Sequence, residues 1–191
     1  LYPWKGGRLL EIAFQVYNLI TNKLIVEYST VVKQPFDVWK CSQTGALECN
    51  GMTWEKVQKG KDEIVVSLEI KEIFAKYNLV RGKAIFICQN PNFDRAFFDQ
   101  LIPRQDQTQN KIPYHWFDLS SMHFTRMMLQ IRLKKKPPKV LYDAQFSKDI
   151  IGKYYGTKPE EKPHGALNGV KHLKKVYDMV LTPRFKKKKK S

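Results

Sequence analysis

The sequence predicts a single α/β domain in which a mixed sheet is flanked by helices, and three observations indicate this fold class. Residues 9–17 and 24–32 are rich in branched and aromatic side chains and are separated by turn formers, which is typical of a β-hairpin. Residues 63–77 repeat apolar side chains at helical spacing. Residues 83–88 end in a short apolar run, typical of a strand that helices bury on both faces. Strands that alternate with helices in this way indicate an α/β sheet.

The elements after the apolar strand follow the same alternation. Residues 92–101 are expected to form a helix, and residues 114–117 another strand. Either Asp118 or Ser120 is placed to cap a helix over residues 122–133.

The last third of the chain mixes loop signals with one strong helical pattern. Residues 134–163 hold the clusters KKKPPK and KPEEKP, which predict loop, with a short helix over residues 146–155. Residues 164–180 carry one apolar face and are predicted to close the domain as a helix. Between the predicted hairpin and residues 63–77 lies a polar, mixed segment that contains Gly45, Asn50-Gly51 and Gly60.

Charge is the most unusual feature of the composition. The chain has 191 residues, enough for one domain, and carries 34 Lys and Arg against 18 Asp and Glu, a net charge of +16. An apolar content of 42% excludes a disordered protein, so the charge lies on a folded body. Such an excess favours nucleic acid as the partner, because neutralising phosphates releases counterions. The lysine run at residues 186–190 is either a loosely binding tail or only a solvated, solubilising appendage.

The cysteines and the apolar runs bear on the cellular compartment. Cys41, Cys49 and Cys88 are odd in number and lack CxxC spacing, which argues against disulfides and zinc and fits a reducing cytoplasm. No apolar run approaches the about 20 residues that a membrane span needs. We therefore expect a cytoplasmic protein without a membrane partner.

A run at the end of the predicted buried strand, CQNPNFDRAFF, contains the first recognisable motif. Asn90, Phe93 and Asp94 resemble the HNAxFDxxFL motif of the DEDDh family of 3′-to-5′ exonucleases, the group that contains polymerase proofreading subunits and RNase T. Gln89 stands where the family usually has His. This resemblance implies an RNase H-like fold.

Three further stretches resemble the same family in the same order. The sequence HGAL, which begins at His164, resembles the third motif, HxALxD. Residues 8–13, RLLEIA, resemble the strand RIIEIA, and residues 49–57 resemble the stretch hNGITxxxV. Together the four stretches cover nearly the whole chain, so residues 1–183 are interpreted as an exonuclease-like domain and residues 184–191 as a basic tail.

The resemblance implies both the chemistry and the residues that perform it. Two divalent cations, Mg²⁺ or Mn²⁺, would clamp the scissile phosphate, with Asp94 as one carboxylate ligand. His164 would be the general base that takes a proton from the attacking water. Leu1, Asn90 and Phe93 would contact the terminal nucleotide of single-stranded DNA or RNA. The ordinary alternatives are that Asp94 only caps a helix and that His164 is only a surface residue.

The sequence departs from the family pattern in two places. The first motif, D-x-E, occurs nowhere in the chain, and Leu1-Tyr2-Pro3 resembles the residues that directly follow it, so the central strand is expected to be missing. The fourth acid should lie five residues after the base, where Gly169 stands. A variant motif, Y-x-x-x-D, matches Tyr114 to Asp118 by spacing, but we interpret Asp118 as a helix cap.

Three functions compete at this point. The leading one is a metal-dependent 3′-to-5′ exonuclease that acts on single-stranded ends. The second is a catalytically impaired member of the same fold that binds nucleic acid through its basic surface, which Gly169 favours. A basic binder unrelated to nucleases would explain the charge but none of the motifs.

Overall fold

The structure is a computed structural model, and it describes residues 6–134, 146–160 and 162–182. Its elements in chain order are β1 (Glu11–Tyr17), β2 (Leu24–Val31), α1 (Phe36–Lys40), α2 (Thr44–Asn50), α3 (Trp54–Gln58), α4 (Glu63–Lys76), β3 (Phe86–Cys88), α5 (Pro91–Leu101), α6 (Arg104–Gln109), β4 (Trp116–Asp118), α7 (Leu119–Lys134), α8 (Lys148–Tyr155) and α9 (Ala166–Leu181). Strands and helices therefore alternate as the sequence predicts, and the α/β fold class is confirmed.

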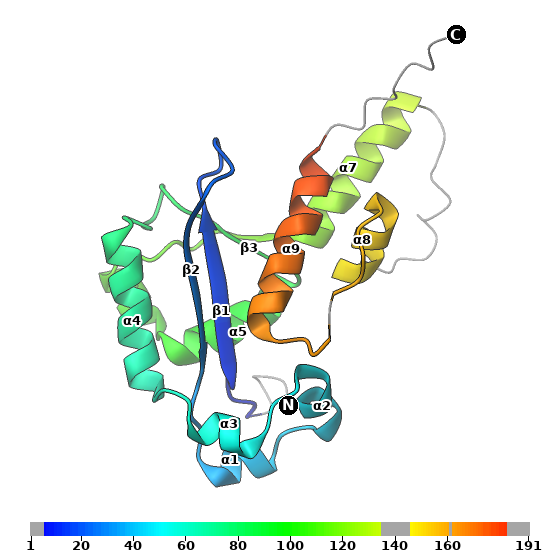
Figure 1. The fold of residues 1–191 in the computed structure, drawn as a ribbon. Helices are drawn as coiled ribbons and strands as arrows, with labels where there is room; N and C mark the ends of the chain where they lie inside the picture. Colours follow the sequence, from blue (N-terminus) through cyan, green and yellow to red (C-terminus); the bar gives the residue numbers. More distant parts are fainter. Residues whose placement is uncertain (1–5, 135–145, 161, 183–191) are drawn as a thin grey trace.

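The hairpin of β1 and β2 stands in the middle of the molecule (Figure 1), between α4 on one side and α9 on the other. The two strands pair antiparallel, with Glu11 opposite Val31 and Val16 opposite Val26. Asn18 closes the turn between them, because its backbone N–H and C=O bond to Lys23 and Asn22 at 2.9 and 2.8 Å. The predicted hairpin is thus confirmed, and α9 packs along β1.

The sheet is divided into two pairs of strands. β3 pairs with β4 in parallel, and within the described residues no hydrogen bond joins this pair to the hairpin. Ile85 is exposed, and Phe86 and Ile87 are half-buried, so the expectation of a strand buried on both faces is wrong in this respect. The physical reason is that, in the part of the chain described, β3 has a neighbouring strand on one edge only.

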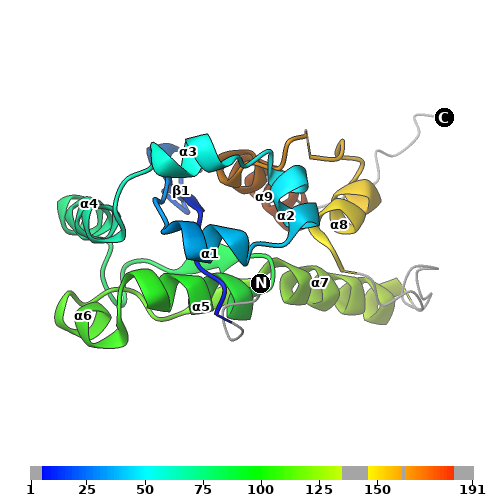
Figure 2. The same cartoon turned by 90° about the horizontal axis from the view of Figure 1, so that it is seen from below.

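The apolar core consists of two clusters that correspond to the two sides of the molecule. The first joins the hairpin, α4 and α5, and its buried members are Val32, Val66, Ile70, Phe74, Phe98, Leu101, Ile102 and Ile112. The second joins α7, α8 and α9 through Leu119, Ile151, Tyr155, Val176 and Val180. Figure 2 shows α4 and α6 at one end of the molecule and α7 and α8 toward the other, with α9 between β1 and α8.

Several boundaries differ from the predicted ones. The polar, mixed segment before residue 63, for which the sequence indicates no particular element, contains the short helices α1, α2 and α3. The hydroxyl of Thr53 caps α3 by accepting the N–H of Lys56 at 3.3 Å, and Gly51 ends α2 in the left-handed region, with φ +59°. Such helices have only five to seven residues, too few to show an apolar repeat.

The remaining observations concern the cysteines and the apolar segments. All three cysteines are free thiols, as expected. Among the helices in the described ranges, none is both long enough and apolar enough to span a bilayer. The basic tail at residues 184–191 lies outside the described residues, as does most of the KKKPPK cluster.

Candidate active site

Three of the motif-bearing stretches meet at the segment that leads into α9. The backbone N–H of His164 donates to the carbonyl of Cys49 at 2.9 Å, and the N–H of Ala166 donates to the Glu11 carboxylate at 2.9 Å. The carboxylate thus binds the first N–H group of α9, at a helix N-terminus, where negative charge is favoured. The segments around residues 11, 50 and 164, far apart in the sequence, therefore form one structural unit.

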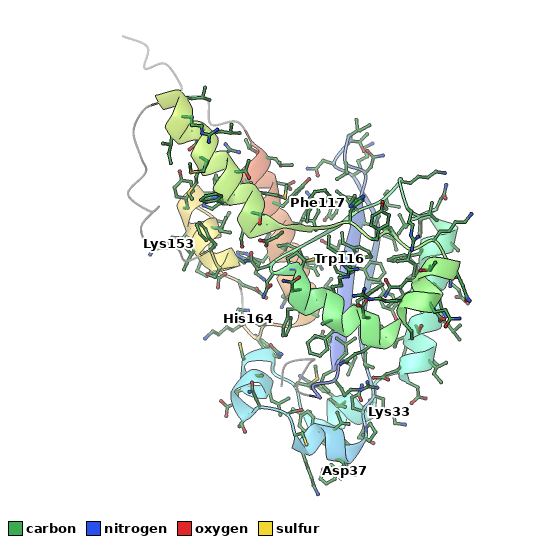
Figure 3. The ribbon with its side chains drawn as sticks, turned by 180° about the vertical axis from the view of Figure 1, so that it is seen from behind. Lys33, Asp37, Trp116, Phe117, Lys153 and His164 are labelled. Carbon is green, nitrogen blue, oxygen red and sulfur yellow. The ribbon has the colours of Figure 1, made fainter. Side chains whose placement is uncertain are left out.

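Close packing maintains this junction. A Cβ atom at Gly51 would lie 2.9 Å from the Cβ of Pro163, so a larger residue could not occupy this position without a shift of the chain. His164 itself precedes α9, which begins at Ala166, so the prediction of a helix from residue 164 is wrong by two residues. In Figure 3 His164 lies near α2, at the lower end of α9.

The His164 imidazole faces a buried carboxylate. Its Nδ1 atom lies 3.1 Å from Oε1 of Glu160, whose side chain is 4% exposed, whereas the imidazole is 28% exposed. Burial of Glu160 raises the pKa of its carboxyl group, but the hydrogen bonds from Lys148 and His164 outweigh burial, and the net pKa is lowered. A carboxylate at Nδ1 favours the tautomer that keeps its proton there and leaves Nε2 free to accept one.

Asp94 lies inside the first turn of α5 and does not cap it. The N-cap residue is Asn90, in the left-handed region at φ +58°, so the alternative reading of Asp94 as the cap is wrong. The side chain of Asp94 is exposed to solvent. Desolvation by the surrounding protein nevertheless raises the pKa of its carboxyl group, against the opposing effects of its own backbone N–H and of Lys148. Within the described residues no side chain forms an ion pair with Asp94.

Asp118 is the helix cap that the sequence predicts. It precedes α7, and its carboxylate accepts the backbone N–H groups of Ser120 at 3.1 Å and Ser121 at 3.2 Å. It also accepts the N–H of Asn90 at 3.2 Å, which ties the end of β4 to the turn before α5. Burial raises the pKa of Asp118, but these hydrogen bonds prevail and lower it.

Lys148 connects the Asp94 side of the site with the His164 side. Its ammonium group bonds to the Glu160 carboxylate and donates to the Gly169 carbonyl at 3.2 Å. The same positive charge also acts on Asp94, where it opposes the rise in pKa that desolvation causes. Asp94 and His164 therefore belong to one electrostatic network, joined through Lys148 and Glu160.

The residues present could supply only part of the metal site that the resemblance implies. Asp94 is an exposed carboxylate that could receive a cation, and oxygen ligands of this kind suit Mg²⁺ or Mn²⁺. On the other side, Gly169 supplies no carboxylate, and Glu160 is already paired with Lys148. No group of three or more His, Cys, Asp or Glu in the described ranges could hold a metal ion.

The residues predicted to contact substrate are only partly accounted for. Leu1 lies outside the described residues. Asn90 lies at the start of α5, and the ring of Phe93 is 38% exposed and stands 5.0 Å from that of Phe97, edge to face. Their contact with a nucleotide stays a prediction.

Two residues of the network were not anticipated from the sequence. Lys148 falls in the short helix predicted over residues 146–155 and Glu160 in the predicted loop after it, where one more charge carries no distinctive signal. The only available sign was the position of Glu160 four residues before His164.

A group of aromatic and basic side chains lies on the short helices of residues 33–58. The Phe36 ring stands 5.0 Å from that of Trp54, which is 5.9 Å from that of Trp39. The Lys40 ammonium lies over Phe36, 4.6 Å from the ring centroid. Phe36 and Trp54 also line an open hollow of about 320 Å³ together with Lys33. Figure 3 shows Lys33 and Asp37 at this end of the molecule. We call Phe36, Trp39, Trp54 and Lys40 the aromatic cluster.

Comparison of the sequence with protein-family models and with curated proteins found no match. Solved structures, in contrast, share the fold. Cell-death related nuclease 4 matches with a TM-score of 0.64 and 13% identity, over 90% of this chain and 56% of that protein. E. coli exonuclease I in complex with a dT13 oligonucleotide matches with a TM-score of 0.67 and 18% identity, over 92% of this chain and 37% of that protein.

A third match is the structure of a 3′-exonuclease in 3′-end specific recognition of a histone mRNA stem-loop. Its TM-score is 0.64 at 13% identity, over 91% of this chain and 56% of that protein. The chain thus spans little more than half of two of these proteins and about a third of the other. At these identities the likeness shows the fold, which is that of 3′-exonucleases of RNase H-like architecture.

Proposed function

We propose that this chain is a metal-dependent 3′-to-5′ exonuclease domain that hydrolyses phosphodiester bonds at the 3′ ends of single-stranded nucleic acid. The observation that supports this most is the network of Asp94, Lys148, Glu160 and His164. It links a candidate metal ligand electrostatically to a candidate base from a distant part of the chain, on a fold shared with 3′-exonucleases.

Each residue of the network has a role that its surroundings suit. Asp94 is exposed and would serve as a ligand of Mg²⁺ or Mn²⁺; a cation bound there would polarise the scissile phosphate. His164 would take a proton from the attacking water at Nε2, since Glu160 faces Nδ1 and holds the ring in place. Glu160 is a positioning residue, which acts through His164.

The aromatic cluster supports a single-stranded substrate. Unpaired bases stack on exposed aromatic rings, and each such contact contributes about 1–3 kcal/mol to binding. Phe36 is 49% exposed, and Lys40 and Lys33 are near enough to attract phosphates that adjoin a stacked base. A duplex would not present free base faces to this surface.

The second candidate is a protein of the same fold that binds nucleic acid without cutting it. The specific observation in its favour is Gly169, which leaves the network without a carboxylate at a position where the resemblance implies a metal ligand. The two candidates share the partner and differ in turnover.

A cleavage assay separates them. The full chain is incubated with end-labelled single-stranded DNA and RNA in Mg²⁺, Mn²⁺ or EDTA, and release of nucleoside monophosphates is followed beside binding measured by anisotropy. A protein distinguishes RNA from DNA through its contacts to the 2′-hydroxyl group, so both kinds of strand are tested. We expect turnover that requires metal and is abolished in Asp94→Asn, with binding retained. Glu72→Gln, at an exposed acid on α4 away from the aromatic cluster, is the matched control.

Two results would contradict the proposal. Turnover at the parent rate in Asp94→Asn would exclude Asp94 as a ligand. Tight binding without any metal-stimulated release, on either substrate, would identify the non-cleaving candidate.

A further inference from the structure

The start of α8 is attached to the start of α5 by Gln89. The side-chain amide of Gln89 donates to the Ser120 hydroxyl at 2.6 Å and to the Phe146 carbonyl at 2.8 Å. Ser120 donates to the same carbonyl at 2.9 Å. Ser147 then caps α8, and Lys148 is its first residue. Gln89 therefore determines where Lys148 enters the site.

The Lys148 ammonium is enclosed by oxygen atoms from the other side of the site. Besides the Glu160 carboxylate it contacts the Gly169 carbonyl at 3.2 Å, and the two side chains of the pair are 19% and 4% exposed. An ammonium group has three N–H donors. Glu160 and Gly169 use two of them, and among described residues no partner takes the third.

The Lys148–Glu160 pair occupies the space that a side chain at position 169 would need. A Cβ atom at Gly169 would lie 3.5 Å from Oε1 of Glu160 and 3.6 Å from Nζ of Lys148. A carboxylate extending beyond that Cβ would meet the pair. The space in front of Gly169 is therefore already filled by a negative and a positive group.

We propose that Lys148 is the resident cation of this site: its ammonium group takes the place of one divalent cation, between the Glu160 carboxylate and the Gly169 carbonyl. This inference deepens the proposed function, because it assigns one of the two cations of that chemistry to a side chain. The site would then take at most one divalent ion, on the Asp94 side.

Electrostatic repulsion explains why Lys148 and a divalent ion cannot both occupy the position between Glu160 and Gly169. Two cations a few ångströms apart repel strongly at a partly buried site, and Lys148 is held in place by contacts to two parts of the chain. A lysine ammonium is also a compact point charge, so it can neutralise a carboxylate or a phosphate oxygen without an ordered hydration shell.

The inference is tested by metal binding in the absence of nucleic acid. Mn²⁺ is titrated into the parent chain, Lys148→Met and Lys148→Gln, and the free ion is measured by electron paramagnetic resonance. We expect both variants to bind Mn²⁺ at least tenfold more tightly than the parent, because Glu160 becomes available as a ligand. Lys148→Gln removes the charge but keeps a side-chain amide that can donate to the Gly169 carbonyl, so it can retain the contact to α9. Lys153→Met, at an exposed position of the same helix, is the control (Figure 3).

A double variant adds a second criterion. Gly169→Asp alone should change Mn²⁺ affinity less than twofold, because Lys148 would pair with the new carboxylate. The double variant Gly169→Asp/Lys148→Met should bind Mn²⁺ most tightly of all. Identical Mn²⁺ isotherms for the parent, Lys148→Met and Lys148→Gln would overturn the inference. So would an equal gain from Gly169→Asp with and without Lys148. Because no substrate is present, these results are independent of whether the chain cleaves nucleic acid.

Discussion

At the scale of single residues, His164 shows how its surroundings can assign a role to a side chain. Its backbone is held by Cys49, its imidazole faces Glu160, and the N–H two residues later is bound by Glu11. A surface histidine without function would not require three such constraints. The position is therefore suited to a group whose orientation matters.

Replacing this imidazole should impair catalysis more than binding. We expect His164→Ala to lower the rate of nucleotide release by about 10²–10⁴-fold, the usual contribution of a general base. Mn²⁺ affinity and strand affinity should stay within about twofold of the parent. His115→Ala, at an exposed position before β4, serves as the control. A loss of Mn²⁺ affinity as large as the loss of rate would instead make His164 a metal ligand.

Asp118 gives a prediction about stability and pH. Its folded pKa lies below its unfolded value of about 3.9 because backbone N–H groups bind the ionised form. Its contribution is therefore present above about pH 4 and is lost as the pH falls through the folded pKa. Asp118→Asn keeps a capping oxygen but loses the charge, so it should lower the free energy of unfolding by about 0.3–1 kcal/mol at pH 7, the usual effect of a negative charge at a helix N-terminus. Urea midpoints should show a smaller difference at pH 3. A difference that does not change with pH would show that the charge is not involved.

At the scale of elements, the contact between α8 and α9 decides where Lys148 lies. Gly152 of α8 has no side chain, and this allows the close approach: a Cβ there would overlap the Thr157 hydroxyl and lie 3.3 Å from Cγ2 of Val176. The helix that carries Lys148 is thus held against the helix that carries Gly169.

A methyl group at Gly152 should separate the two helices. Alanine favours a helix over glycine by about 1 kcal/mol, but overpacking a tight interface costs about 1–3 kcal/mol, so we expect Gly152→Ala to destabilise the fold overall. Gly45→Ala in α2 is the matched control, because a Cβ there meets nothing within 4 Å. Urea unfolding should show opposite signs for the two variants. Equal midpoints would contradict the close-packing account.

The aromatic cluster leads to a prediction about strand binding. Phe36→Ala removes the most accessible ring, and we expect affinity for a single-stranded oligonucleotide to fall by the about 1–3 kcal/mol that a stacked base contributes. Ile20→Ala, in the hairpin turn where the side chain is 95% exposed, controls for loss of exposed apolar surface. Anisotropy titrations measure both. If the two variants bind alike, strands do not stack on this surface.

At the scale of the whole molecule, the net charge of +16 should control association with nucleic acid. The logarithm of the binding constant should fall linearly with the logarithm of the salt concentration, since each phosphate contact releases counterions. Deleting residues 186–191 removes five lysines and should reduce that slope while leaving the cleavage rate unchanged. Loss of cleavage on short oligonucleotides would show that the tail is part of the site.

Taken by itself, the sequence determined the α/β class, the hairpin, the main helices and the cap at Asp118, because these depend on local patterns of apolar and polar residues. It also indicated Asp94 and His164 through short motifs, and their catalytic roles stay predictions. Short helices were not predicted, because five to seven residues contain too few apolar positions to show a period.

Only the tertiary structure decided which charges meet. Lys148 lies in a predicted short helix and Glu160 in a predicted loop, and nothing in their spacing indicates that they face Gly169. Their pairing depends on the anchor at Gln89 and on the close approach of α8 to α9, both long-range contacts. An electrostatic interaction depends on distance in space, whereas a sequence gives only distance along the chain, and the Lys148–Glu160 pair could therefore be recognised only in the folded molecule.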